Sequence, residues 1–180
     1  LSQMSIMAFS GMVVGVVYQA GVSGPVLLLI AILVGVCCGI CNGLVMNYMH
    51  ISPIITTLGT QLVFRALAYI VSDGNMIQIN DDFIKVIGRG DIFGIPTMII
   101  IAAIVYVIGV VLKYTRFGRN VISVGGSEEA AYLSGINIKK TRAIAFMISG
   151  GCAGLATILY IAQGYVAVPN QGSGADMDAI

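Results

Sequence analysis

The chain has 180 residues, of which 58% are hydrophobic and 9% are charged, and its formal net charge at pH 7 is +1. Soluble domains carry about 25% charged residues, so this composition excludes a soluble globular protein and indicates an integral membrane protein whose surface is solvated by lipid. The near-neutral charge, without any basic run, gives no indication of a nucleic-acid partner.

Runs of apolar residues predict an all-α fold, a polytopic transmembrane helical bundle. A membrane-spanning helix needs about 20 mostly apolar residues, and segments of this kind lie at residues 2–20, 26–49, 54–71, 95–112 and 142–162. Turns are predicted after the first segment, at "GVSGP", and after the second, at His50 and Pro53. We interpret residues 1–180 as a single transmembrane domain truncated at both ends, because the sequence opens within an apolar stretch that has neither an initiator methionine nor the features of a signal peptide.

Three glycines in the second apolar segment predict close helix packing. Gly35, Gly39 and Gly43 recur every four residues, so they share one helix face. Small residues at this spacing let two helix backbones approach closely within a bilayer. We predict that this glycine stripe packs inside a compact bundle, and the alternative is a dedicated seam between two subunits.

The third apolar segment carries four polar residues that are candidates for lining a transport pathway. Arg65 is an ionisable residue inside a predicted span, and such residues are costly in the membrane and often functional. It lies about 10 Å from the outer end of the span, so its side chain could instead extend outward and anchor in the interface. Thr57, Thr60 and Gln61 could bind the hydroxyl groups of a transported solute, or could bond to backbone and neighbouring helices.

The remaining reactive side chains do not form a recognisable catalytic or metal centre. Cys37, Cys38 and Cys41 include a C-x-x-C pattern, but no histidine or second cysteine pair lies nearby in the sequence. We interpret them as small apolar residues of a helix and predict no metal and no cofactor. The sequence holds no P-loop and no G-x-S-x-G motif, so we expect no enzymatic activity from this chain alone.

Lysine and arginine predict which loops face the cytoplasm, because cytoplasmic loops are enriched in these residues. The loop at residues 113–141 and the boundary residue after it hold six of them, Lys113, Arg116, Arg119, Lys139, Lys140 and Arg142. The loop at residues 72–94 holds Lys85 and Arg89 against four aspartates, Asp73, Asp81, Asp82 and Asp91. The sequence therefore predicts a cytoplasmic loop at 113–141 and an external loop at 72–94.

A short polar stretch, "GGSEEAAYLSGI" at residues 125–136, interrupts this otherwise apolar chain. Glu128 and Glu129 favour the N-terminus of a helix, where they oppose the positive end of its dipole, and Gly135 suits the C-terminal stop. The helix would have about two turns, which is too short to be stable alone in water. We expect either a plain solvent-facing loop helix or a helix that docks on another protein.

Residues 129–135, "EAAYLSG", resemble the EAA loop of ATP-binding-cassette importer permeases, in which E-A-A-x-x-x-G marks the cytoplasmic coupling helix. The wider "TRFGRNVISVGGSEEAAYLSGINIKK", the stretch at residues 42–74 and the terminal "GSGADMDAI" are similar to the ribose and related monosaccharide permease branch. The chain departs from the wider pattern in its opening block "LSQMSIMAFSGM", where the family's aspartate is missing, and in two further places. No I-x-L-P element follows Gly135, and Ala175, Asp176 and Met177 stand where the family usually has tyrosine, glutamate and leucine.

The resemblance implies a multi-pass permease of about ten spans in the bacterial inner (plasma) membrane, to which this chain contributes a central five. It further implies a second permease subunit, ATPase subunits that supply ATP hydrolysis, and an extracytoplasmic sugar-binding protein that delivers a ribose-like monosaccharide. The residues that would contact the ATPase are Glu128, Glu129, Ala130, Ala131 and Gly135. The basic flanks of the loop would bind either lipid headgroups or the ATPase.

Other cargoes and classes of protein remain open at this point. The same architecture could carry branched-chain amino acids, nucleosides or a signalling furanose. A secondary transporter would instead be expected to have ionisable residues buried within its spans and an inverted repeat. Every acidic residue of this chain lies outside the predicted spans, which favours the ATP-driven importer.

Overall fold

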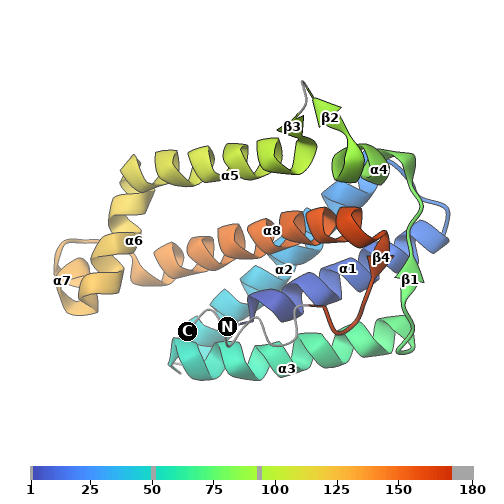
Figure 1. Cartoon of the computed structure of the whole chain (residues 1–180). Helices are drawn as coiled ribbons and strands as arrows, with labels where there is room; N and C mark the ends of the chain where they lie inside the picture. Colours follow the sequence, from blue (N-terminus) through green and yellow to red (C-terminus); the bar gives the residue numbers. More distant parts are fainter. Residues whose placement is uncertain (1, 50–51, 93–94, 172–180) are drawn as a thin grey trace.

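The computed structural model describes residues 2–49, 52–92 and 95–171, and these form a bundle of apolar helices with a few very short strands (Figure 1). Two features named above, the turn at His50 and the terminal "GSGADMDAI" with Ala175, Asp176 and Met177, lie outside the described residues.

Long helices occupy all five apolar segments. Their bounds are α1 Gln3–Gln19, α2 Pro25–Met49, α3 Pro53–Ser72, α5 Thr97–Tyr114 and α8 Ile138–Gly164. Among the described helices, four (α2, α3, α5 and α8) are long and apolar enough to cross a membrane. The other, α1, has 17 residues, which is at the lower limit of about 17 for a membrane-spanning helix. The predicted all-α transmembrane bundle is therefore confirmed.

Short helices fill much of the two polar connections. They are α4 Asp82–Arg89, α6 Arg116–Gly126 and α7 Glu128–Leu133. Only α7 is predicted by the sequence, and the loops expected at 72–94 and 113–141 contain α4 and α6 as well. Both extra helices begin at a side-chain cap, since Asp81 accepts a hydrogen bond from Phe83 N and Thr115 accepts one from Gly118 N. A search for long apolar runs cannot detect them, because they are short and carry polar residues.

Two pairs of two-residue antiparallel strands close the same end of the bundle. β1 Ile77–Gln78 pairs with β4 Val166–Ala167, and β2 Asp91–Ile92 pairs with β3 Ile95–Pro96. The first pair joins the chain after α3 to the chain after α8, with Ile77 opposite Ala167. It therefore ties two distant segments together at the end where α4 lies (Figure 1).

The glycine stripe of α2 lies against α8. A Cβ atom placed on Gly35 would overlap the carbonyl oxygen of Gly150, and one placed on Gly39 would overlap that of Phe146. In return, a Cβ on Gly154 would overlap the carbonyl oxygen of Ala31. The third glycine of the stripe, Gly43, faces Ala143 of α8. The two helix backbones are thus in direct contact, which side chains larger than hydrogen would prevent.

Helices α1 and α5 have opposite surroundings. α1 packs against α2, α3 and α8, its Ser10 hydroxyl shares a 2.7 Å hydrogen bond with Thr157, and its Phe9 ring stacks on Phe64 at a centroid distance of 6.3 Å. No residue of α5 is buried, and its main contacts are with α4, α6 and β3. An apolar helix with this exposure is suited to contact lipid or another membrane helix.

Candidate functional site

Helix α7 lies at the end of α8 opposite to α4, on a hairpin formed with α6 (Figure 1). Both of its ends are fixed by local hydrogen bonds. At the start, the Ser127 hydroxyl accepts a hydrogen bond from Ala130 N at 3.3 Å. At the end, Gly135 N donates to Tyr132 O at 2.9 Å and Ile136 N donates to Ala131 O at 3.0 Å, which is the Schellman pattern of a helix stop. Gly135 has a φ of 75°, a conformation that glycine adopts without strain.

The side chains of α7 differ in exposure. Ala131 is buried, whereas Glu129 and Ala130 are exposed. Tyr132 and Leu133 are 73% and 85% exposed. The helix therefore presents a carboxylate and two large apolar groups outward while a small residue packs inward.

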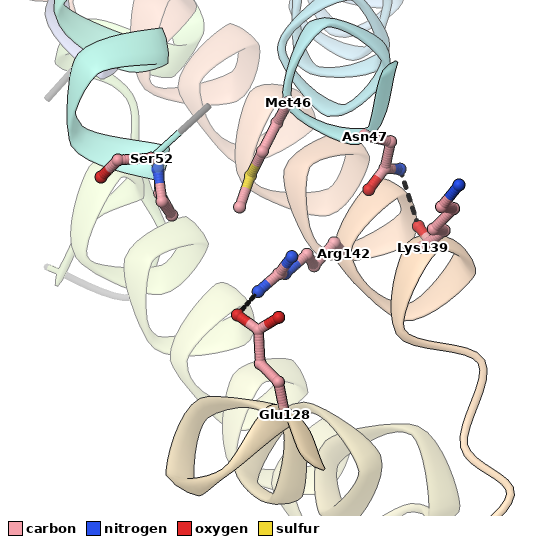
Figure 2. Close-up of a pocket in the computed structure, with 7 residues that line it drawn as sticks. Met46, Asn47, Ser52, Glu128, Lys139 and Arg142 are labelled. Carbon is pink, nitrogen blue, oxygen red and sulfur yellow. Dashed lines mark hydrogen bonds and ion pairs between the residues drawn. The ribbon is translucent and has the colours of Figure 1, made fainter. Parts of the chain in front are cut away.

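An ion pair connects α7 to α8. Arg142, in the second turn of α8, donates to the carboxylate of Glu128, the first residue of α7 (Figure 2). The Arg142 side chain is 24% exposed and that of Glu128 is 56% exposed. Beside the pair is an open hollow of about 290 Å³ lined by Met46 and Asn47 of α2, Ser52 and Pro53 at the start of α3, and Lys139. Asn47 Nδ2 donates to the carbonyl oxygen of Lys139 at 2.9 Å, which joins α2 to the start of α8.

The structure separates the five residues predicted to contact an ATPase into different surroundings. Glu129 and Ala130 are exposed, Glu128 faces Arg142, Ala131 is buried, and Gly135 forms the helix stop. The capping residue Ser127 and the partner Arg142 were not among the predicted site residues. A serine directly before two glutamates is a recognisable start signal for a helix, whereas the ion pair depends on how the hairpin folds back on α8.

The polar residues of α3 form a second set, which runs from the second turn of that helix to just past its middle. The Thr57 hydroxyl donates to Pro53 O at 2.9 Å and the Thr60 hydroxyl donates to Thr56 O at 3.0 Å. These protons are therefore engaged with the backbone of α3. Gln61 is half-buried. Arg65 Nη1 donates to Asn170 Oδ1 at 3.3 Å, a contact with the chain after α8.

Among the residues that the structure describes, no group of three or more histidine, cysteine, aspartate or glutamate side chains could hold a metal ion. In the C-x-x-C stretch, Cys38 is buried and Cys37 and Cys41 are exposed on the surface of α2. They lie on a helix whose other residues are almost entirely apolar.

A bundle of long apolar helices, four of them long and apolar enough to cross a membrane, defines a polytopic membrane protein, and the capped, exposed helix α7 lies at one end of it. All 180 residues match the family described as branched-chain amino acid transport system / permease component, and the chain belongs to this family.

Individual relatives are sugar permeases. The chain is 36% identical to the D-allose transport system permease protein of Escherichia coli over 183 residues, which cover 100% of this chain and 56% of that protein. It is 35% identical to the ribose import permease protein of Bacillus subtilis over 184 residues, which cover 100% of this chain and 57% of that protein. It is 40% identical to the L-arabinose transport system permease protein of Escherichia coli over 119 residues, which cover 66% of this chain and 36% of that protein. No solved structure matches the chain.

The resemblance to monosaccharide importer permeases is therefore confirmed, and the chain spans little more than half the length of the first two of these relatives.

Proposed function

We propose that this chain is part of the membrane-spanning permease subunit of an ATP-driven importer, and that the importer carries a monosaccharide across the bacterial inner membrane. The observation that carries the proposal is α7, a helix too short to be stable alone that is capped at both ends and exposes Tyr132 and Leu133. The names of the relatives, which specify allose, ribose and arabinose transport, support a monosaccharide as cargo.

In this proposal α7 docks into a groove on a cytoplasmic ATPase subunit. A helix in a groove is recognised through a few apolar anchors, and Tyr132 and Leu133 are the anchors available on α7. The basic residues around α6 and the start of α8, against the aspartates around α4, support a cytoplasmic location for the α7 end. The external sugar-binding protein would then meet the α4 end.

Movement of α7 would pass to the bundle through Glu128 and Arg142. Arg142 belongs to α8, and α8 is in backbone contact with α2 along the glycine stripe. Two helices in such contact move as one body, because any sliding would force backbone atoms into each other. ATP hydrolysis comes from the ATPase subunits, since the sequence holds no phosphate-binding loop. A second permease subunit completes the pathway.

A second candidate cargo is a branched-chain amino acid, because that is the substrate class in the description of the matching family. It shares the architecture and the ATPase contact with the first candidate. Uptake assays with radiolabelled D-ribose and L-leucine in cells that express the complete importer distinguish the two cargoes.

Cysteine crosslinking from position 129 tests the ATPase contact. We would place Glu129→Cys in the permease that carries this sequence, after replacing Cys37, Cys38, Cys41 and Cys152, and co-express it with the candidate ATPase. The matched control is Val86→Cys on α4, a residue that is 62% exposed at the other end of the bundle. We expect an ATP-sensitive crosslink from position 129 and none from position 86. A well-inserted Glu129→Cys protein that crosslinks to no co-expressed ATPase would refute the docking role.

A further inference from the structure

The segment after β4 turns back into the helix bundle. Gln171 N donates to Val168 O at 3.1 Å, which closes a turn, and Figure 1 shows this segment returning between α1 and α3. The Gln171 side chain is only 2% exposed. Its Oε1 lies 3.3 Å from the position that a Cβ on Gly11 would take. Because Gly11 is the middle residue of α1, Gln171 lies well inside the bundle and away from both ends of that helix.

Gln171 and Arg65 both carry buried polar atoms that are not hydrogen-bonded. Within the described part of the chain, neither Nε2 nor Oε1 of Gln171 has a hydrogen-bond partner, and the same holds for Nε and Nη2 of Arg65. The two residues are linked through Asn170, whose Oδ1 accepts the 3.3 Å hydrogen bond from Arg65 Nη1. The reversed segment therefore places the Asn170 side chain at Arg65 of α3 and the side chain of the next residue, Gln171, at Gly11 of α1.

Such a cluster is costly unless something binds it. A buried donor or acceptor without a partner destabilises the fold, and more strongly when it is charged. Inside a bilayer no bulk water is available to lower this cost. Arg65 and Gln171 hold four such atoms, and a polar molecule bound for part of a working cycle would supply their missing partners.

The chemistry of these atoms indicates the class of ligand. A guanidinium only donates hydrogen bonds, whereas an amide side chain both donates and accepts. An anion would satisfy Arg65 but would be opposed by the acceptor Oε1 of Gln171. A neutral molecule with several closely spaced hydroxyl groups matches all of them, because each hydroxyl both donates and accepts.

We propose that Arg65, Asn170 and Gln171 form a binding site for a polyhydroxyl solute within the membrane, on the translocation pathway. The inference rests on the proposed import function and names the residues that would contact the sugar as it crosses. Asn170 and Gln171 belong to this site together with Arg65. The sequence predicted a role for Arg65 but not for Asn170 or Gln171.

The test measures sugar transport and ATP hydrolysis in the same proteoliposomes. The complete importer is reconstituted with saturating binding protein, and uptake of radiolabelled D-ribose, D-allose and L-arabinose is compared with ATP turnover. The variants are Gln171→Leu and Arg65→Met, which remove the polar atoms at similar volume. We expect sugar moved per ATP to fall about tenfold, the equivalent of about 1.4 kcal/mol for lost hydrogen bonds to the sugar, while ATP turnover stays near that of the wild type. Arg65→Lys, which keeps a charged donor, should recover part of the loss.

Two further variants keep the proposal falsifiable if the buried substitutions disturb folding. Asn170 is exposed, so Asn170→Ala should fold and should lower sugar moved per ATP more mildly. Ser72→Ala is the matched control on α3, because its hydroxyl donates to Ala68 O of the same helix at 2.9 Å, and its ratio should equal that of the wild type.

The possible results distinguish an error in the proposed binding site from an error in the proposed import function. An unchanged ratio of sugar to ATP in the Gln171, Arg65 and Asn170 variants would overturn the site and leave the import function intact. The site would be overturned equally if sugar uptake and ATP turnover fell in the same proportion together with thermal stability, because that is the result of a purely structural role. A wild-type importer that moves none of the three sugars would instead refute the monosaccharide function itself.

Discussion

Glu128, the first residue of α7, pairs with Arg142, which lies one turn into α8. This pair is a direct side-chain link between a short exposed helix and a long helix of the bundle. Arg142 is mostly buried beside the ends of α2 and α3, whereas Glu128 is more than half exposed. The ion pair therefore joins Arg142, which is packed in the bundle, to Glu128, which lies on the helix that we propose is moved by an ATPase.

The first prediction concerns this pair. Glu128→Lys places a positive charge against Arg142, which repels α7 from α8, so we expect ATP-driven uptake to fall while insertion in the membrane is kept. The double variant Glu128→Arg with Arg142→Glu restores an attractive pair and should recover part of the uptake. Partly exposed pairs contribute only about 0.2–1 kcal/mol, so thermal stability should change little. Equal uptake in the wild type and in Glu128→Lys would contradict a role in transmission.

The second prediction compares two glycine-to-alanine substitutions in helices. At Gly35 the added methyl group would overlap the carbonyl oxygen of Gly150, so α2 and α8 must separate. Overpacking of this kind costs about 1–3 kcal/mol. At Gly59 on α3 a methyl group meets nothing within 4 Å, and alanine stabilises a helix by about 0.5–1 kcal/mol relative to glycine. The melting temperature of the detergent-solubilised protein should fall for Gly35→Ala and stay equal or rise for Gly59→Ala. A fall of similar size in both variants would mean that the contact between α2 and α8 is not decisive.

The third prediction concerns Asp81, which is 6% exposed and accepts two backbone hydrogen bonds. Its Oδ1 accepts from Phe83 N at the start of α4 and its Oδ2 accepts from Gly24 N in the turn between α1 and α2, both at 2.8 Å. Asp81→Ala removes a helix cap, which costs about 0.5–2 kcal/mol, and also leaves Gly24 N without its acceptor. We expect a clear loss of thermal stability for Asp81→Ala and a smaller loss for Asp81→Asn, which keeps one acceptor.

The neighbouring Asp82 provides the control for Asp81. Its side chain is almost fully exposed and pairs with Lys85 at 3.0 Å, so Asp82→Ala should change the melting temperature at neutral pH very little. The hydrogen bond to Asp82 raises the pKa of Lys85 above its usual value. A raised lysine pKa stabilises the fold below the unfolded value of about 10.4, and this contribution is lost only as the pH rises through the folded value. Stability scans from pH 6 to about 8 should therefore be parallel for the wild type and Asp82→Ala.

The fourth prediction separates docking from folding at α7. Tyr132 and Leu133 are highly exposed, so replacing both with serine should change stability by no more than about 0.5 kcal/mol. The same double variant removes the proposed anchors, and we expect much less ATPase to co-purify with the permease. Ala131→Leu is the contrasting variant, because Ala131 is buried and a larger side chain there should disturb α7 itself. Undiminished co-purification with the double serine variant would show that other surfaces hold the ATPase.

Much of this molecule follows from patterns that are local in the sequence. Apolar runs of the length of a bilayer predict the long helices, because a chain in lipid must satisfy its backbone hydrogen bonds within each span. The stretch from Glu128 to Gly135 predicts α7, because acidic residues at a helix start and a glycine at its stop act through the adjacent backbone. The recurring glycines of α2 predict a closely packed face without naming the partner helix.

Only the tertiary structure decided which residues meet across the bundle. The contact of Gly35 with Gly150, the pair of Glu128 with Arg142, and the approach of Asn170 to Arg65 each join segments that are distant in the sequence. The short helices α4 and α6 depend in part on the same cause, because a helix of about ten residues needs packing partners to be stable. Propensity and hydropathy act over one or two helical turns, whereas these contacts depend on how whole helices pack together. The sequence by itself therefore determined the class of protein and the short helix α7, and the folded chain decided that Glu128 of α7 pairs with Arg142 of α8 and that Asn170 meets Arg65.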